Sequence, residues 1–119
     1  MQHINLLGAH TEHVGLKPFA TALYGVLGIV DGEERESGNY VGGSYLKGSR
    51  DGIAFTIALS DEEAHEDLPY WIHISADMEP DVLEAEVSRL VRDMALQAGF
   101  HLARIINFGK RSEERVDYQ

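Results

Sequence analysis

The chain has 119 residues and a formal net charge of −10, from 20 acidic and 10 basic residues, with 44% apolar residues and no cysteine. These values are typical of one folded soluble domain, and they exclude disulfides, cysteine-ligated metal centres and a cysteine nucleophile. No apolar run reaches the roughly 18 to 20 residues of a membrane span, and the start lacks a signal-peptide pattern. We therefore expect a cytoplasmic protein with no membrane contact, and the negative charge argues against a nucleic-acid partner.

The first half of the chain predicts one helix and two strands. A helix is expected at about 17–28, where Pro18 suits the first turn, although the bulky run at 26–30 is also compatible with a strand. A turn-rich loop separates the strands expected at 40–47 and 53–59. Residues 4–7 are a candidate for a short edge strand. The segment 31–39 is a polar connector.

The second half predicts two strands around the longest helix. The strand at 70–76 alternates, so that Tyr70 shares one face with the isoleucines, while Trp71, His73 and Ser75 share the other. Apolar residues at three- and four-residue steps predict a helix at about 80–98, which ends at Gly99. A last strand is expected at 101–108, with Leu102, Ile106 and Phe108 on one face. The segment 109–119 is expected to be a frayed polar tail of the single domain 1–119.

This order predicts the α+β class. Strands that follow one another favour a mostly antiparallel sheet of three to five strands, with both helices packed on one face. The other face would then be partly open to solvent.

The negative charge is concentrated in residues 61–81, which hold eight acidic residues and no basic one. Ser60 and Glu63 have the spacing of a helix capping box. Glu62, Glu66 and Asp67 have no such local role, and they fit a solvated loop, a partner-binding patch or a divalent-cation site. Aromatic residues are enriched at interface centres and also cap core edges; those on the expected strands are Tyr40, Tyr45, Tyr70 and Trp71.

The histidines suggest two further chemistries. His73 on its strand could act as a general base if a carboxylate such as Asp77 oriented its ring. His10 and His13, three residues apart, could bind a metal with Glu12 or another carboxylate. Both patterns are also typical of ordinary surface histidines. Glycine-rich phosphate loops and the serine-elbow motif are missing, so no catalytic residue, cofactor or metal ligand is assigned.

The sequence thus favours a non-enzymatic protein–protein interaction module, of the inhibitor, immunity or adaptor type, that binds a basic protein. Its expected binding residues are Glu62, Glu66, Asp67, Tyr70, Trp71 and His73. The alternative is a small histidine- or metal-dependent enzyme. A homodimer formed through the open sheet face is a third possibility.

Overall fold

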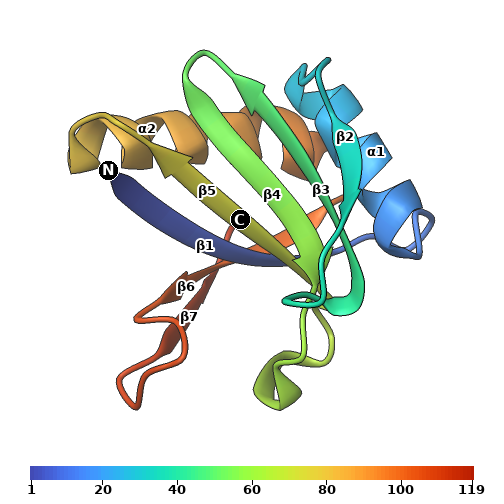
Figure 1. The fold of residues 1–119 in the computed structure, drawn as a ribbon. Helices are drawn as coiled ribbons and strands as arrows, with labels where there is room; N and C mark the ends of the chain where they lie inside the picture. The colour runs from blue at the N-terminus through green and yellow to red at the C-terminus, as the bar shows by residue number, and fades with distance from the viewer.

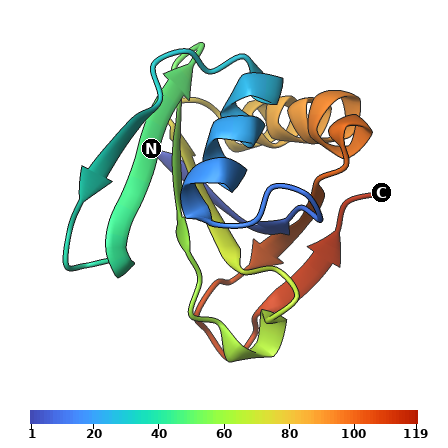
Figure 2. The same ribbon diagram turned by 90° about the vertical axis from the view of Figure 1, so that its right-hand side faces the viewer.

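The computed structural model describes all 119 residues as an α+β fold, with a seven-stranded antiparallel sheet and two helices on one of its faces (Figure 1; Figure 2). The sheet order is β2-β3-β4-β5-β1-β6-β7. The strands are β1 (Gln2–Ala9), β2 (Glu33–Glu36), β3 (Val41–Arg50), β4 (Ile53–Leu59), β5 (Tyr70–Ala76), β6 (His101–Ile106) and β7 (Glu114–Asp117). The predicted class is confirmed, but three to five strands is an undercount.

The first strand, β1, is central, whereas residues 4–7 were expected at an edge. It pairs with β5 on one side and with β6 on the other. Ile4 and Leu6 face the helices, and Leu7 is fully buried on the opposite face. A strand that is buried on both faces loses its alternating pattern. The short apolar run at residues 4–7 therefore did not indicate whether the strand lies inside the sheet or at its edge.

The two edge strands were not predicted at all. β2 lies in the segment expected as a polar connector, and β7 lies in the segment expected as a frayed tail. Their sequences, EERE and ERVD, have almost no apolar residues and so show no strand pattern. Backbone hydrogen bonds to β3 and β6 hold them in the sheet, and burial contributes little. Charged side chains on such edges also discourage pairing with other chains.

Both helices end in the same glycine arrangement. α1 (Leu16–Leu27) stops at Gly28, and α2 (Pro80–Leu90) continues through a π turn (Val91–Ala95) and a 3-10 turn (Leu96–Ala98) to Gly99. Each glycine is left-handed, with φ of 74° and 88°, and the following N–H reaches back to a helical carbonyl. The helical span 80–98 is thus as predicted, and the run 26–30 is a helix end, not a strand.

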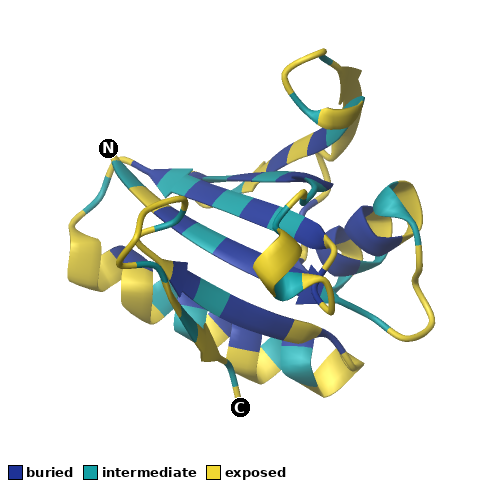
Figure 3. Cartoon of the chain, turned by 90° about the horizontal axis from the view of Figure 1, so that it is seen from below, coloured by how far each residue is buried: buried dark blue, intermediate teal, exposed yellow.

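The sheet separates two cores of unequal size. The larger lies between the sheet and the helices, and Figure 3 shows the alternation of buried and less buried residues along the central strands that produces it. The smaller lies on the other face and consists of Leu7, Leu68, Ala103 and Ile105, with Ala9, Trp71 and Phe108 packed against it. We call it the second core.

Phe108 reaches the second core because the last predicted strand is shorter than expected. β6 ends at Ile106, and Asn107 has a positive φ of 56° that turns the chain toward β7. Phe108 therefore does not continue the alternation of Leu102 and Ile106. No helix of the chain combines the length and apolar character needed to cross a membrane.

Candidate functional site

The acidic residues expected to bind a partner lie in the loop between β4 and β5. We call residues 61–66 the acidic loop. It contains a single 3-10 turn (Glu63–His65), which begins after Glu62 without a side-chain cap. The Ser60 hydroxyl accepts the N–H of Glu62 at 3.2 Å. The predicted capping box of Ser60 and Glu63 is therefore wrong, because one 3-10 turn does not provide the helical N3 position that a box requires.

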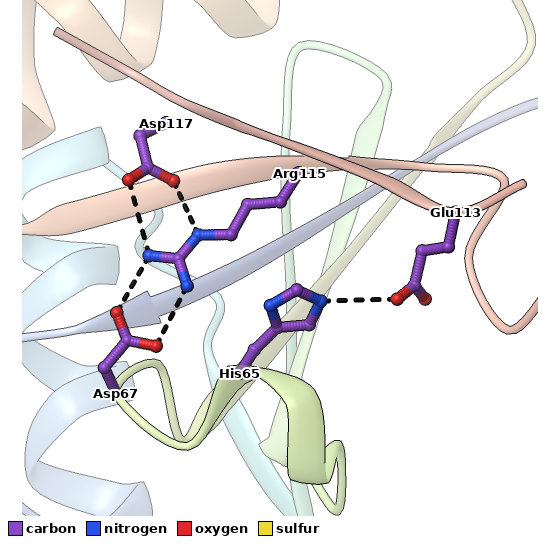
Figure 4. A network of polar contacts seen from close by, with 5 residues as sticks. All are labelled: His65, Asp67, Glu113, Arg115 and Asp117. Atoms are coloured by element: carbon purple, nitrogen blue, oxygen red, sulfur yellow. Dashed lines mark hydrogen bonds and ion pairs between the residues drawn. The ribbon is translucent and has the colours of Figure 1, made fainter.

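Two polar links join the connection between β4 and β5 to the β6–β7 hairpin, and we call them the clasp (Figure 4). Arg115 on β7 donates to both carboxylate oxygens of Asp67, at 2.9 and 2.8 Å, and also to Asp117. His65 lies 3.2 Å from the carboxylate of Glu113, whose other oxygen accepts the N–H of Gly109. Directly after Asp67, the buried side chain of Leu68 enters the second core.

The clasp lowers the pKa of two carboxyl groups. Hydrogen bonds from Arg115 lower the pKa of Asp67 below its ordinary value. The Gly109 N–H and, secondarily, His65 lower the pKa of Glu113. Asp67 is thus a structural group, already matched by an intramolecular cation, whereas the sequence suggested it as a contact for a partner.

The remaining carboxylates of the acidic loop form no ion pair. They belong to Asp61, Glu62, Glu63 and Glu66. A hollow of about 240 Å³ lies among them, and it is lined by these four residues together with Ser60, His65, Leu68 and Pro69. Like charges on a short loop without counter-ions create a local negative potential.

The other acids of residues 61–81 are far from this loop. Asp77, Glu79 and Asp81 follow β5, at the start of α2, while the acidic loop precedes β5. A seven-residue strand is roughly 20 Å long. The apparent cluster of eight acids in sequence is therefore two separate clusters in space.

Tyr70 and Trp71 point to opposite faces of the sheet. Tyr70 is 5% exposed, stacks on Phe19 at 4.2 Å and accepts a hydrogen bond from the Gly15 N–H, all on the helical side. Trp71 lies half-buried on the other face, where its indole N–H donates to Asn5 at 2.9 Å. Tyr70 is thus a core residue, whereas Trp71 stays partly accessible to solvent.

Trp71 belongs to a group of aromatic residues that the sequence did not assemble. We call Tyr40, Tyr45, Trp71 and Phe108 the aromatic strip. Tyr40 stacks on Tyr45 at 4.4 Å and lies 6.2 Å from Trp71, which lies parallel to Phe108 at 5.7 Å between ring centres. The sequence placed Tyr45 and Trp71 on alternating strands, which was the one indication that the two rings could meet. Their alignment across the sheet depends on a bulge between Val41 and Tyr45, which the sequence does not reveal.

His73 contacts another histidine. Its Nε2 lies 3.1 Å from Nδ1 of His3, so that one imidazole donates and the other accepts. Burial, and then the charge of His3, lowers the pKa of His73. Asp77, the carboxylate suggested for it, is exposed beyond the end of β5.

His10 uses both ring nitrogens within the fold. Nε2 donates to the carbonyl of Ala98 at 3.0 Å, and Nδ1 accepts the backbone N–H groups of Glu12 and His13. Metal binding by His10 would break these bonds, which hold the β1–α1 loop against the end of the second helix. Nowhere do three histidine, aspartate or glutamate side chains converge as a metal-binding group.

A pocket of about 520 Å³ lies against the Asp67–Arg115 part of the clasp. Its wall combines apolar residues such as Phe100 and Leu102 with His10, His101 and the Asp67–Arg115 pair. The polar groups of that pair are already engaged with each other, so they do not point to a ligand.

Comparison of the chain with family models, curated proteins and solved structures gave no significant match. The site described above must therefore carry any functional argument, since fold class alone does not imply function.

Proposed function

We propose that this protein is a non-enzymatic interaction module, of the inhibitor, immunity or adaptor type, that binds a basic protein through its acidic loop. The observation that carries the proposal is the contrast within residues 61–67. Asp67 is neutralised by Arg115 and fixes the loop, whereas Asp61, Glu62, Glu63 and Glu66 form no ion pair.

The physical basis is electrostatic steering toward a surface that is already ordered. Four uncompensated carboxylates attract a cationic surface and accelerate encounter in a salt-dependent way. Because Leu68 and the clasp anchor the loop, less conformational entropy is lost when a partner binds. Trp71, on the same face as the second core, supplies an aromatic contact beside the charge.

The test compares two variants of equal net charge. Glu62→Gln/Glu66→Gln removes two charges from the acidic loop, and Asp77→Asn/Glu79→Gln removes two from the separate cluster at the other end of β5. Each purified protein is used to capture partners, and the association rate of the captured protein is measured between low and high salt.

A basic partner should associate at least several-fold more slowly with the Glu62→Gln/Glu66→Gln variant and at an unchanged rate with the other. Equal slowing by both variants would mean that net charge alone is responsible, and that result would refute a role for the acidic loop. An unchanged rate in both would refute the electrostatic proposal itself.

A further inference from the structure

The aromatic strip lies across the sheet face that the helices leave uncovered. Tyr45 and Trp71 stand in one cross-strand row with Ala58 between them, since Ala58 pairs with Tyr45 on one side and with Trp71 on the other. Ala58 is fully buried even though it belongs to this face. The large rings therefore shield it, and they do so while each remains half-exposed to solvent.

The central ring of the strip is held in one orientation. The indole N–H of Trp71 donates to Asn5 on the neighbouring strand, and Phe108 lies parallel to it from the β6–β7 hairpin. Both Trp71 and Phe108 pack against the second core, which also contains Leu68 at the end of the acidic-loop segment. Leu68 also lines the hollow among the uncompensated carboxylates, so the same residue links the aromatic strip to the acidic loop.

This combination favours one kind of cation. A guanidinium group is planar, weakly hydrated and stacks on aromatic faces, while its N–H groups bind carboxylates in pairs. An ammonium group is a compact, strongly hydrated point charge, so it gains less from a flat aromatic surface. The hollow of about 240 Å³ within the acidic loop provides carboxylates from Glu62 and Glu66 on opposite ends of one short turn.

Resting on the proposed function, we infer that the partner presents arginine in preference to lysine, with a guanidinium stacked on the aromatic strip beside the acidic loop. Two cations of the chain lie at the Tyr45 end of the strip: Arg35, which pairs with Tyr45 and is bonded to Glu33 at 3.1 Å, and the exposed Lys47. Trp71 lies two strands further along the sheet, on β5, which follows the acidic loop. Lys110 and Arg111 lie at the exposed hairpin tip, where repulsion restricts the approach of the partner to the acidic side.

The experiment uses Trp71, the only tryptophan of the chain, as a fluorescent reporter. The intact protein is titrated with hexa-arginine and with hexa-lysine peptides, which have equal side-chain charge. The expected result is saturable change in Trp71 emission with a Kd for hexa-arginine about fivefold or more below that for hexa-lysine.

Two variants separate this inference from the proposed function. Tyr40→Ser/Tyr45→Ser alters half-exposed rings and should bring the two Kd values within about twofold of each other. Glu62→Gln/Glu66→Gln should weaken both peptides alike and leave their ratio unchanged. Thermal unfolding of each variant verifies the fold, and Tyr40→Ser alone replaces the double variant if that one is unfolded.

Equal affinity of the two peptides for the unaltered protein would overturn the arginine preference and leave the electrostatic proposal standing. A preference that survives the tyrosine substitutions would likewise overturn the role of the strip. If Glu62→Gln/Glu66→Gln changes neither Kd, the proposed function fails instead, irrespective of the ratio.

Discussion

Leu68 decides whether the acidic loop is an ordered surface or a mobile one. Its side chain is 3% exposed and is the contribution of the β4–β5 loop to the second core. In Leu68→Ala, three carbons leave a site walled by Leu7, Ala103 and Ile105. The loop would then be held mainly by the two polar links of the clasp, of which the Asp67–Arg115 pair is exposed at Asp67 and contributes little on its own.

The expected loss of unfolding free energy follows from that setting. Buried leucine-to-alanine changes cost about 2.7 to 5.0 kcal/mol where the surroundings cannot collapse. The second core is small and one wall is a loop that can relax inward, so we expect about 2 to 3 kcal/mol. For a chain of this length that corresponds to a fall in Tm of roughly 10 °C.

Urea unfolding followed by circular dichroism measures this loss, with Leu96→Ala as the matched control. Leu96 is only half-buried, at the margin of the larger core, so its truncation should cost clearly less than that of Leu68. A loss of unfolding free energy in Leu68→Ala of under about 1 kcal/mol, or no greater than that in Leu96→Ala, would refute the idea that Leu68 anchors the loop in the second core. It would also remove the preorganisation on which the proposed surface depends.

Three further outcomes test other parts of the structure. Tyr24→Phe should cost about 1 to 2 kcal/mol in urea unfolding, because its hydroxyl is buried against two strand carbonyls at 3.0 and 2.8 Å; no loss would contradict that hydrogen bonding. Arg115 lowers the pKa of Asp67, so this contribution to stability is present above about pH 4 and disappears as the pH falls through the lowered value. Asp67→Asn should be less stable at pH 7 and lose less stability on acidification, and an unchanged acid transition would exclude the Asp67–Arg115 link. The pKa of His73 is lowered in the folded protein, so the unfolded chain binds a proton at this residue first as the pH falls, and the free energy of unfolding should decrease from about pH 6.5 toward the lowered value. His73→Gln should flatten that decrease, and an equally steep decrease in the variant would assign the effect to another histidine.

Local patterns in the sequence were sufficient for the strongly patterned elements. The bounds of β4 and β5 match the alternating runs, because one face of each strand is buried in the larger core and the other face is mostly only partly buried. The span 80–98 follows from the three- and four-residue apolar spacing and from Gly99, whose φ of 88° suits a residue without a side chain. The same reasoning could not identify β2 and β7, whose stability comes from their neighbours in the sheet.

The candidate site depended on tertiary structure. The sequence determined that eight acids lie within 21 residues and that Trp71 and His73 share a strand face. Only the fold separated those acids by the length of β5, buried Tyr70 against the helices, and neutralised Asp67 with a residue 48 positions away. The physical reason is that charge and burial depend on neighbours in space: strand order brought Arg115 to the acidic segment and placed four aromatic rings from distant segments side by side.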